Sequence, residues 1–257
     1  MSSIGCRRSW SQGLLALVCV FGVTASFASE ISDAVTRAEF GFYAGEPGTI
    51  ASAIAALERL DAGPHEELRT VHLAYAHWKL AQLRSPDDPA GALAAAERCV
   101  EALEAVVDLR TTPPEALAVQ SACYGLLASL GGVLKAPLNS LRSARRMEAA
   151  LAIAPDNPRV RYIDGLREAD RPAAPGGDPA KAHQKLRDAV VAFETDGELA
   201  VGDEPRWGHA EALAWLGKSY FELGDLIAAR ESLERALIIA PDYAWAQRLL
   251  TGLARPR

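Results

Sequence analysis

The histidines are the first residues whose chemistry we consider, because imidazole groups can bind a metal or transfer protons. His72 and His77 stand five positions apart, which places them about 140° apart around a helix, so they do not share a face. Neither belongs to the His-Glu-x-x-His spacing of a zinc protease. His65, His183 and His209 are scattered along the chain. This pattern favours ordinary surface or partly packed histidines over a metal or catalytic site.

A second candidate for chemistry is the proline- and glycine-rich segment 171–177 ahead of Asp178. A helix that begins near Asp178 presents free amide groups, which favour an anion such as phosphate. The aspartate side chain competes for those same amides, and no Lys-Ser or Lys-Thr follows the glycines as in a phosphate-binding loop. No serine stands in a nucleophile-elbow sequence either. We therefore predict no catalytic residue, no cofactor and no metal site, and we expect a protein that is not an enzyme.

The cysteines allow two interpretations. Cys99 and Cys123 both lie inside alanine-rich patterns that are typical of helices. In an oxidising compartment the two thiols can form a disulfide, but cysteine in such a pattern is also often a small buried apolar residue. Two cysteines without a nearby histidine do not make a zinc site. The sequence leaves the disulfide open.

Residues 1–28 have the organisation of a secretory signal peptide. Two arginines precede an apolar run at 13–23, and Ser26 and Ala28 stand where the small residues of a cleavage site are expected. The run is about half the length needed to span a bilayer. We therefore expect an exported protein, periplasmic or secreted, that is cleaved after about Ala28. A retained membrane anchor is the alternative.

The charge of the chain restricts its partners. The net charge is −6, and removal of Arg7 and Arg8 with the signal peptide makes it −8. An acidic chain without a basic run argues against nucleic acid as a partner, and against an anionic membrane surface. A protein or peptide partner is the remaining expectation.

The elements that position these residues are helices with a repeated pattern. Five segments begin with a residue that can cap a helix, and small or apolar residues follow four, eight and eleven positions later, on one helix face. The five predicted caps are Thr49, Asp88, Asn139, Asp178 and Asp225. A small residue four positions after each cap lets a neighbouring helix approach closely in every unit. The five segments therefore predict repeated helical units, and no run of alternating β-branched residues predicts a strand.

The last unit resembles the tetratricopeptide repeat. Its two helices carry Leu213, Leu216, Gly217 and Tyr220, then Ala229, Leu233, Ala236 and Pro241. The family has Trp-x2-Leu-Gly-x2-Tyr, followed by Ala, Phe, Ala and Pro. Leu213 and Leu233 depart from the family's Trp and Phe. A weaker second match consists of Leu127, Leu130, Gly131 and Leu134, then Ser143, Met147, Ala150 and Pro155.

The resemblance implies an all-α, right-handed superhelical solenoid of about five degenerate helix pairs over residues 29–257. Residues 210–243 are the best-matching repeat, and a capping helix is expected from about Asp242 to Leu253. The chain also resembles exported members of the family that have a glycine-rich insertion and a Trp-Gly dipeptide before the last repeat, here Trp207-Gly208.

In tetratricopeptide proteins the first helix of each pair lines a concave groove. This resemblance implies that a partner binds at Glu211, Lys218, Phe221, Glu222 and Trp245. Phe221 and Trp245 either anchor a peptide or pack against the capping helix. The expected function is a non-catalytic scaffold or adaptor that holds another envelope or secreted protein in its groove. The alternative is a ligand-binding accessory of an envelope transport system, and self-association into a homo-oligomer is also left open.

Overall fold

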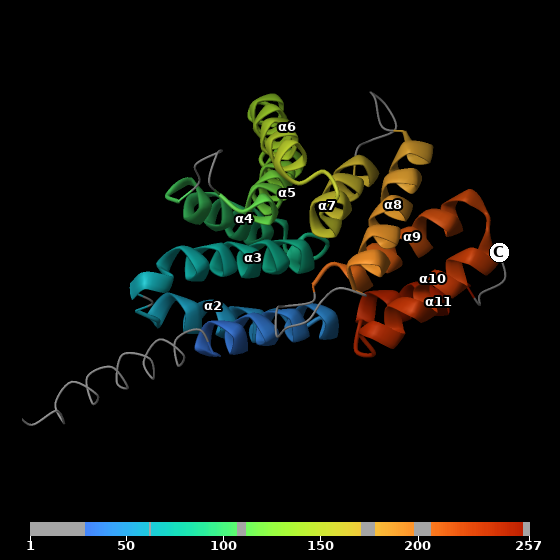
Figure 1. The fold of residues 1–257 in the computed structure, drawn as a ribbon, viewed down its shortest axis with the longest axis horizontal. Coiled ribbons are helices and arrows are strands. Elements are labelled where there is room, and N and C mark those ends of the chain that lie inside the picture. Colours follow the sequence, from blue (N-terminus) through green and yellow to red (C-terminus); the bar gives the residue numbers. More distant parts are fainter. Residues whose placement is uncertain (1–28, 62, 107–111, 171–177, 198–206, 254–257) are drawn as a thin grey trace, which may run out of the picture.

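The computed structural model describes residues 29–61, 63–106, 112–170, 178–197 and 207–253. Within these residues the chain forms helices and no β-strand (Figure 1). A first helix covers residues 29–44. The elements that follow are α2 (Pro47–Arg59), the 3₁₀-helix η1 (Gly63–His65), α3 (Glu66–Arg84), α4 (Pro89–Glu104), α5 (Pro114–Leu130), α6 (Ala136–Ile153), α7 (Pro158–Ala169), α8 (Pro179–Gly197), α9 (His209–Leu223), α10 (Leu226–Ile239) and α11 (Ala244–Leu253). This composition confirms the predicted all-α class.

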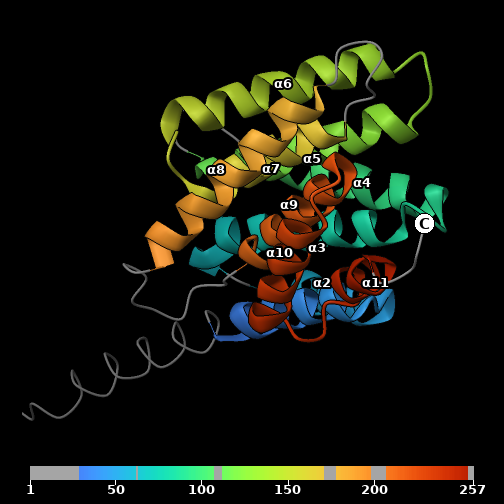
Figure 2. The ribbon, with the colours of Figure 1, turned by 90° about the vertical axis from the view of Figure 1, so that its right-hand side faces the viewer.

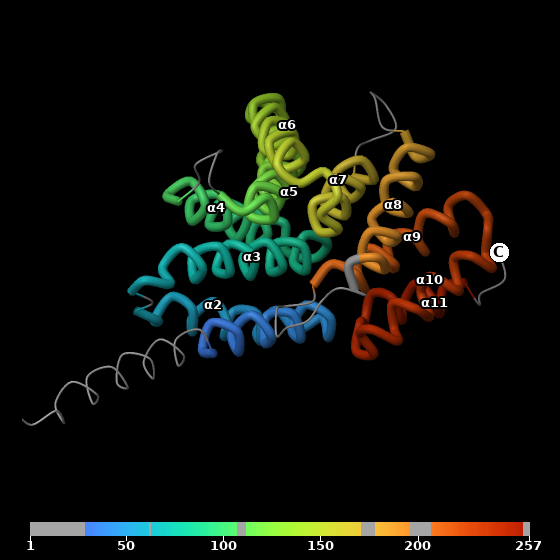
Figure 3. The backbone as a smooth tube through the Cα atoms, in the orientation of Figure 1, coloured from blue at the N-terminus to red at the C-terminus, as the bar shows by residue number. Residues whose placement is uncertain are grey.

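The helices form successive hairpins that stack into a solenoid (Figures 1 and 3). The pairs α3–α4, α5–α6, α7–α8 and α9–α10 each make their main contacts internally. The helix of residues 29–44 pairs with α2, and a side-chain carbon at Gly41 would lie only 3.0 Å from Ile50. At the other end α11 packs on α9 and α10. The predicted five helix pairs and the terminal capping helix are thereby confirmed.

Three of the five predicted helix caps are confirmed. The carboxylates of Asp88, Asp178 and Asp225 accept hydrogen bonds from amide groups of the first turn of α4, α8 and α10, at 2.9 to 3.2 Å. These bonds satisfy amides that a helix leaves without an internal partner. Pro89 and Pro179 follow two of these caps, where a proline costs no hydrogen bond.

The predicted caps at Thr49 and Asn139 are wrong. α2 begins at Pro47, two residues before Thr49. α6 begins at Ala136, so that Asn139 lies buried inside the helix. In both cases a proline in the first turn starts the helix earlier, because its fixed φ angle suits that position.

The second tetratricopeptide match is wrong in register. α5 ends at Leu130. Gly125 rather than Gly131 faces Ser143 of α6, because a side-chain carbon at Gly125 would lie 3.9 Å from the Ser143 hydroxyl oxygen. Residues 131–135 form a long turn, and Leu134 in this turn is 98% exposed rather than packed inside a helix. The prediction assumed the family's regular turn length, which this hairpin does not have.

A continuous core of alanine, leucine and aromatic side chains runs through the stack. Where α5 crosses α6, the hydroxyls of Ser121 and Ser143 each donate to the other residue's backbone oxygen, at 2.8 Å. Cys99 of α4 and Cys123 of α5 form a disulfide that is completely buried. The bridge joins the second helix pair to the third and resolves the alternatives that the sequence left open.

The first and last parts of the solenoid meet. Ring centroids of Phe42 and Tyr43 lie 6.0 and 5.0 Å from that of Tyr243, which stands between α10 and α11. The Tyr43 hydroxyl donates to the carboxylate of Glu211 in α9, at 3.0 Å. Figure 1 accordingly shows the first helix and α11 beside each other. These contacts join the first helix to the last helix pair.

None of the described helices is long and apolar enough to cross a membrane. The predicted signal peptide at 1–28 and the glycine-rich segment 171–177 lie outside the described residues. Trp207 and Gly208 are described and lead directly into α9.

Candidate functional site

Four of the five predicted groove residues lie along α9. Side-chain exposure increases along the helix, from 1% at Glu211 to 33% at Lys218 and 57% at Glu222. Phe221 is half-buried beside Glu222. The predicted stripe therefore begins inside the protein and reaches the surface at the end of α9.

Glu211 does not line an open groove, which corrects its expected role. Its Oε1 atom lies 2.8 Å from the ammonium nitrogen of Lys79 in α3. Its Oε2 atom accepts hydrogen bonds from the Tyr43 hydroxyl at 3.0 Å and from the Gly208 amide at 2.6 Å. Both charged side chains of this ion pair are buried. Both oxygen atoms of the Glu211 carboxylate are therefore bonded to groups inside the protein.

Aromatic rings enclose the ammonium group of Lys79. Its nitrogen lies 4.1 Å from the ring centroid of Trp78 and 4.3 Å from that of Phe42. Tyr75 and Trp207 lie at 5.4 and 5.9 Å. Attraction between a cation and a ring strengthens away from water, so the rings offset part of the cost of burying the charge. We refer to the set Lys79, Glu211, Tyr43, Phe42, Tyr75, Trp78 and Trp207 as the Lys79 clasp.

The dipeptide Trp207-Gly208 places the clasp at the start of α9. Gly208 has a φ of +104°, which other residues rarely adopt, and a side-chain carbon there would lie 2.7 Å from the Phe193 ring. The Trp207 ring packs 4.9 Å from Tyr75 and 5.3 Å from the Arg159 guanidinium group. The dipeptide was noted above as part of the resemblance to exported tetratricopeptide proteins. These contacts explain why a glycine and a large aromatic residue fit at the two positions.

Burial changes the proton affinity of groups around the clasp. Burial lowers the pKa of Lys79, and Glu211 opposes that change. Burial, followed by the charge of Glu211, raises the pKa of Glu39 to about 7. Burial, followed by the charge of Arg159, lowers the pKa of His72 to about 4. The interior therefore disfavours an unpaired charge, and the ion pair is stable there because its two charges compensate each other.

Lys79 and Tyr43 were not predicted to belong to this cluster. They stand 132 and 168 residues from Glu211, and no local pattern connects positions so far apart. In this cluster the opposite charges are bonded to each other and enclosed by aromatic rings, so the pair joins α3 to α9 inside the protein.

Six side chains of the described residues have a buried polar atom without a hydrogen-bond partner, and Gln120 and Glu39 are two of them. Gln120 of α5 is completely buried, and neither its Oε1 nor its Nε2 has a partner among the described residues. One carboxylate oxygen of Glu39, Oε1, is buried in the same way. Buried polar groups nearly always bond to protein, water or ligand. Neither group lines the pocket between the first helix and α2 that is described below.

The exposed end of α9 forms an aromatic patch with α11. Ring centroids of Trp215 and Trp245 lie 5.0 Å apart. The ammonium group of Lys218 lies 5.4 Å from the Trp215 ring and pairs with Glu222. Both tryptophans are half-buried. We refer to the set Trp215, Lys218, Phe221, Glu222 and Trp245 as the α9–α11 patch. Its contacts connect Trp215 with Trp245 and Lys218, and Lys218 with Glu222, while Phe221 precedes Glu222 at the end of α9.

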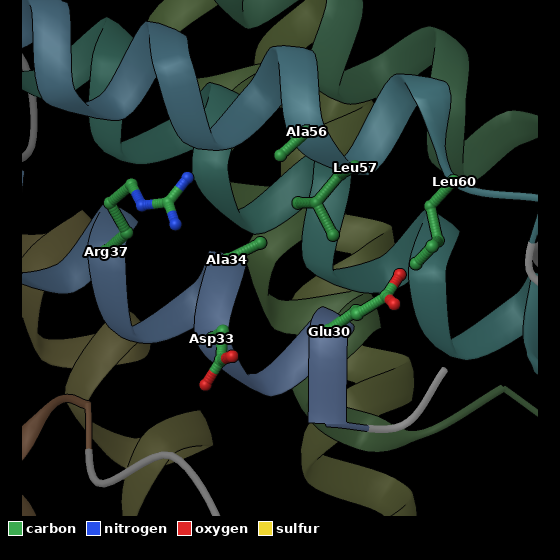
Figure 4. A pocket seen from close by; sticks show the side chains of 7 residues that line it. All are labelled: Glu30, Asp33, Ala34, Arg37, Ala56, Leu57 and Leu60. Carbon is green, nitrogen blue, oxygen red and sulfur yellow. The ribbon is translucent and has the colours of Figure 1, made fainter. Parts of the chain in front are cut away.

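A pocket lies between the first helix and α2 (Figure 4). The first helix supplies the charged side chains, and α2 supplies apolar ones; the lining residues are Glu30, Asp33, Ala34, Arg37, Ala56, Leu57 and Leu60. The charged residues are all exposed, so no buried polar group points to a bound ligand. Within the described ranges, no three histidine, cysteine or acidic side chains are grouped to hold a metal ion.

Comparison with known protein families and with curated proteins gives no match. Among solved structures, a thermophilic TPR protein from Thermus thermophilus is similar to this chain, with 19% identity and a TM-score of 0.52. The alignment covers 80% of this chain and 91% of that protein. Identity at this level bears on the fold alone, and it agrees with the stacked helix pairs described above. The chain therefore has the helical-repeat fold of a tetratricopeptide-repeat protein.

Proposed function

We propose that this protein is a non-catalytic scaffold that holds another envelope or secreted protein, and that the partner contacts the α9–α11 patch. The fold supports the proposal, because stacked helix pairs present an extended surface to a partner. The Lys79 clasp supports the choice of surface, because it closes the inner part of the predicted groove. The observation that carries the proposal is the half-buried Trp215–Trp245 pair beside the exposed pair of Lys218 and Glu222.

The patch has the chemistry of a binding hot spot. Tryptophan supplies a large contact area and is enriched among residues that dominate binding energy. The neighbouring Lys218–Glu222 ion pair is partly exposed at Lys218 and exposed at Glu222, and ion pairs at the surface contribute little to stability. The combination of ring surface and accessible charges therefore fits a contact with a peptide or protein better than it fits a purely structural role.

Site-specific photocrosslinking tests this surface. A photoreactive amino acid replaces Glu222 in the chain 29–257, and a control chain carries it at Glu231, which is also exposed. After incubation with an envelope fraction, we expect one specific crosslinked protein from position 222 only. The product should disappear when Phe221→Ala and Trp245→Ala are added, provided that circular dichroism shows an unchanged fold. Equal crosslinking from both positions would contradict the proposal that the partner binds at the α9–α11 patch.

We further propose that the protein is exported and processed. The organisation of residues 1–28 supports export, and the disulfide between Cys99 and Cys123 is a bond typical of oxidising compartments. Cell fractionation followed by N-terminal sequencing tests this. We expect an envelope or secreted chain that begins at about Ser29, whereas an unprocessed cytoplasmic chain would contradict export.

A second candidate function is a ligand-binding accessory of an envelope transport system. The buried amide of Gln120 and the unused oxygen of Glu39 favour it, because they can bond to a small molecule inside the stack. Native mass spectrometry of the gently purified protein tests this candidate. A bound compound in the wild type that is lost in Gln120→Leu would support it, and a spectrum of the bare protein would oppose it.

A further inference from the structure

The α5–α6 hairpin is basic although the protein is acidic. Residues 116–147 contain no aspartate or glutamate and four basic residues, in a chain whose net charge is −6. These are Lys135, Arg142, Arg145 and Arg146. No ion pair to a carboxylate of the described residues involves any of them. The negative charge of the whole chain argued against binding to an anionic membrane surface. This hairpin nevertheless has a local excess of positive charge.

The turn of the same hairpin exposes apolar side chains. Leu134 is 98% exposed and Val133 is 89% exposed, more than any other large apolar residue in the described part of the chain. Leu138 and Leu141, in the first turns of α6, are about half exposed. Soluble surfaces rarely gather apolar residues in this way without a binding role. We refer to the set Val133, Leu134, Lys135, Leu138, Leu141, Arg142 and Arg145 as the α5–α6 tip.

The geometry of α6 places apolar and basic residues on one outward face. Leu138, Arg142 and Arg145 follow one another at spacings of four and three residues, so they share a face. Ser143 and Met147 occupy the buried face. Figures 1 and 2 both show α6 at the outer edge of the molecule. The tip is therefore presented to whatever approaches this edge.

We propose that the α5–α6 tip docks the protein onto a membrane surface that contains anionic lipids. Val133 and Leu134 enter the boundary between head groups and acyl chains, as the apolar face of an interfacial helix does. Lys135, Arg142 and Arg145 contact the phosphates, because their long side chains reach the head groups while their stems cover apolar surface. The docking is peripheral and requires no membrane-spanning helix.

A bilayer fits this tip better than an acidic protein or a second copy of the chain. The apolar residues Val133 and Leu134 stand in a protruding turn, which can enter the lipid boundary, whereas a protein interface has its apolar residues in a well-packed core. The turn between α9 and α10 provides an internal comparison. Beside it, the first two residues of α10, Leu226 and Ile227, also expose apolar side chains, but Glu222 and Asp225 are near them in the sequence. Arg230, three residues after Ile227, pairs with Glu234, whereas the basic residues of the α5–α6 tip form no ion pair with a carboxylate of the described residues.

Vesicle co-sedimentation tests the proposal with residues 29–257, which carry every described helix and lack the apolar run at 13–23. The probes are vesicles of phosphatidylcholine alone and vesicles that also contain phosphatidylglycerol. We expect binding only to the anionic vesicles, weakened by added salt. Leu134→Asp should lower the apparent affinity about tenfold or more, because it places a charge at the lipid boundary. The double variant Arg142→Glu/Arg145→Glu should abolish the preference for phosphatidylglycerol.

The matched control is Ile227→Asp, the same kind of change at an exposed position in the first turn of α10, near Asp225 and Glu231, and this variant should bind like the wild type. Binding that does not distinguish the two lipids, an absence of binding, or a Leu134→Asp variant that binds normally would each overturn the proposal. Poly-glutamate provides the remaining comparison. If it binds the wild type as strongly as the anionic vesicles do, and Leu134→Asp leaves that binding intact, the tip recognises an acidic protein instead.

Discussion

The ammonium nitrogen of Lys79 lies 2.8 Å from a carboxylate oxygen of Glu211, although 132 residues separate the two in the sequence. This ion pair joins the second helix pair to the fifth, and Tyr43 ties the first helix to the same carboxylate. Repeat proteins usually have contacts between neighbouring repeats only. The Lys79 clasp adds a contact across the stack, so that the helix pairs are expected to unfold together.

Removal of the lysine should show how much this contact contributes. Lys79→Met leaves the Glu211 carboxylate buried without its counter-ion, and we expect a loss of about 3–5 kcal/mol in the free energy of unfolding. The double variant Lys79→Met/Glu211→Gln should recover part of that loss, because a neutral amide is less costly to bury. Urea denaturation followed by circular dichroism measures both. A loss below about 1 kcal/mol, typical of a surface salt bridge, would contradict the role of the clasp.

Glu39 should make the protein less stable as the pH rises. Its pKa is 4.5 as an ordinary glutamate and about 7 in the folded protein, raised by burial and by Glu211 and opposed by Lys79 and Arg159. Between about pH 4.5 and pH 7 the unfolded chain has lost this proton while the folded chain still holds it, so the contribution to stability falls through this window. Glu39→Gln cannot ionise. Its stability relative to the wild type should therefore be greater at about pH 8 than at about pH 5.

The contribution of His72 to stability changes with pH in the opposite direction to that of Glu39. The stability of the wild type alone would therefore mix the two effects, and the difference between variants is measured instead. The pKa of His72 is lowered from 6.5 to about 4, so its contribution is lost as the pH falls below about 6.5. His77 behaves in the same way, with a pKa of about 4. Both histidines are present in the wild type and in Glu39→Gln, so their contributions cancel in the difference. A difference in stability that does not vary with pH would mean that Glu39 is not buried as described.

Features within one or two helices were predictable from the sequence. The caps at Asp88, Asp178 and Asp225 and the terminal helix depend on residues a few positions apart, and periodicity detects such patterns. The turn between α5 and α6 was not predictable, because the alignment with Gly131 assumed a regular hairpin. A turn can lengthen without changing the pattern of either helix, and Leu134 consequently lies at the surface.

The candidate binding residues Lys218, Glu222 and Trp245 came from the resemblance to the tetratricopeptide repeat, whose groove positions were mapped onto the last repeat, and their role stays a prediction. The partner of Glu211 was not found, because it depends on how tightly the solenoid closes. That closure results from packing between distant helices, and no motif in the sequence encodes it.

The disulfide should contribute to stability by limiting the unfolded chain. Cys99 and Cys123 are separated by 24 residues, and a bridge of this span stabilises a protein by about 2–4 kcal/mol. In the chain 29–257, the double variant Cys99→Ala/Cys123→Ala should unfold at a correspondingly lower urea concentration. Thiol titration in denaturant provides the control. Two free thiols in the wild type purified without reductant would show that the bridge does not form.

Gly217 should tolerate a methyl group much less well than Gly125, although both lie inside helices. A side-chain carbon at Gly217 would stand 2.8 Å from Leu233 and 3.1 Å from the backbone oxygen of Ala229. Alanine favours a helix by about 1 kcal/mol over glycine, but overpacking costs about 1–3 kcal/mol, so Gly217→Ala should be destabilising.

At Gly125 the nearest atom, the Ser143 hydroxyl oxygen, is 3.9 Å away, an ordinary contact distance. Gly125→Ala should therefore leave stability unchanged or raise it by up to about 1 kcal/mol. Urea denaturation of the two single variants beside the wild type gives the comparison. If both substitutions stabilise the protein equally, α9 and α10 are not as closely packed as the tetratricopeptide register requires, and the helix pair that most resembles the family would lose its main structural signature.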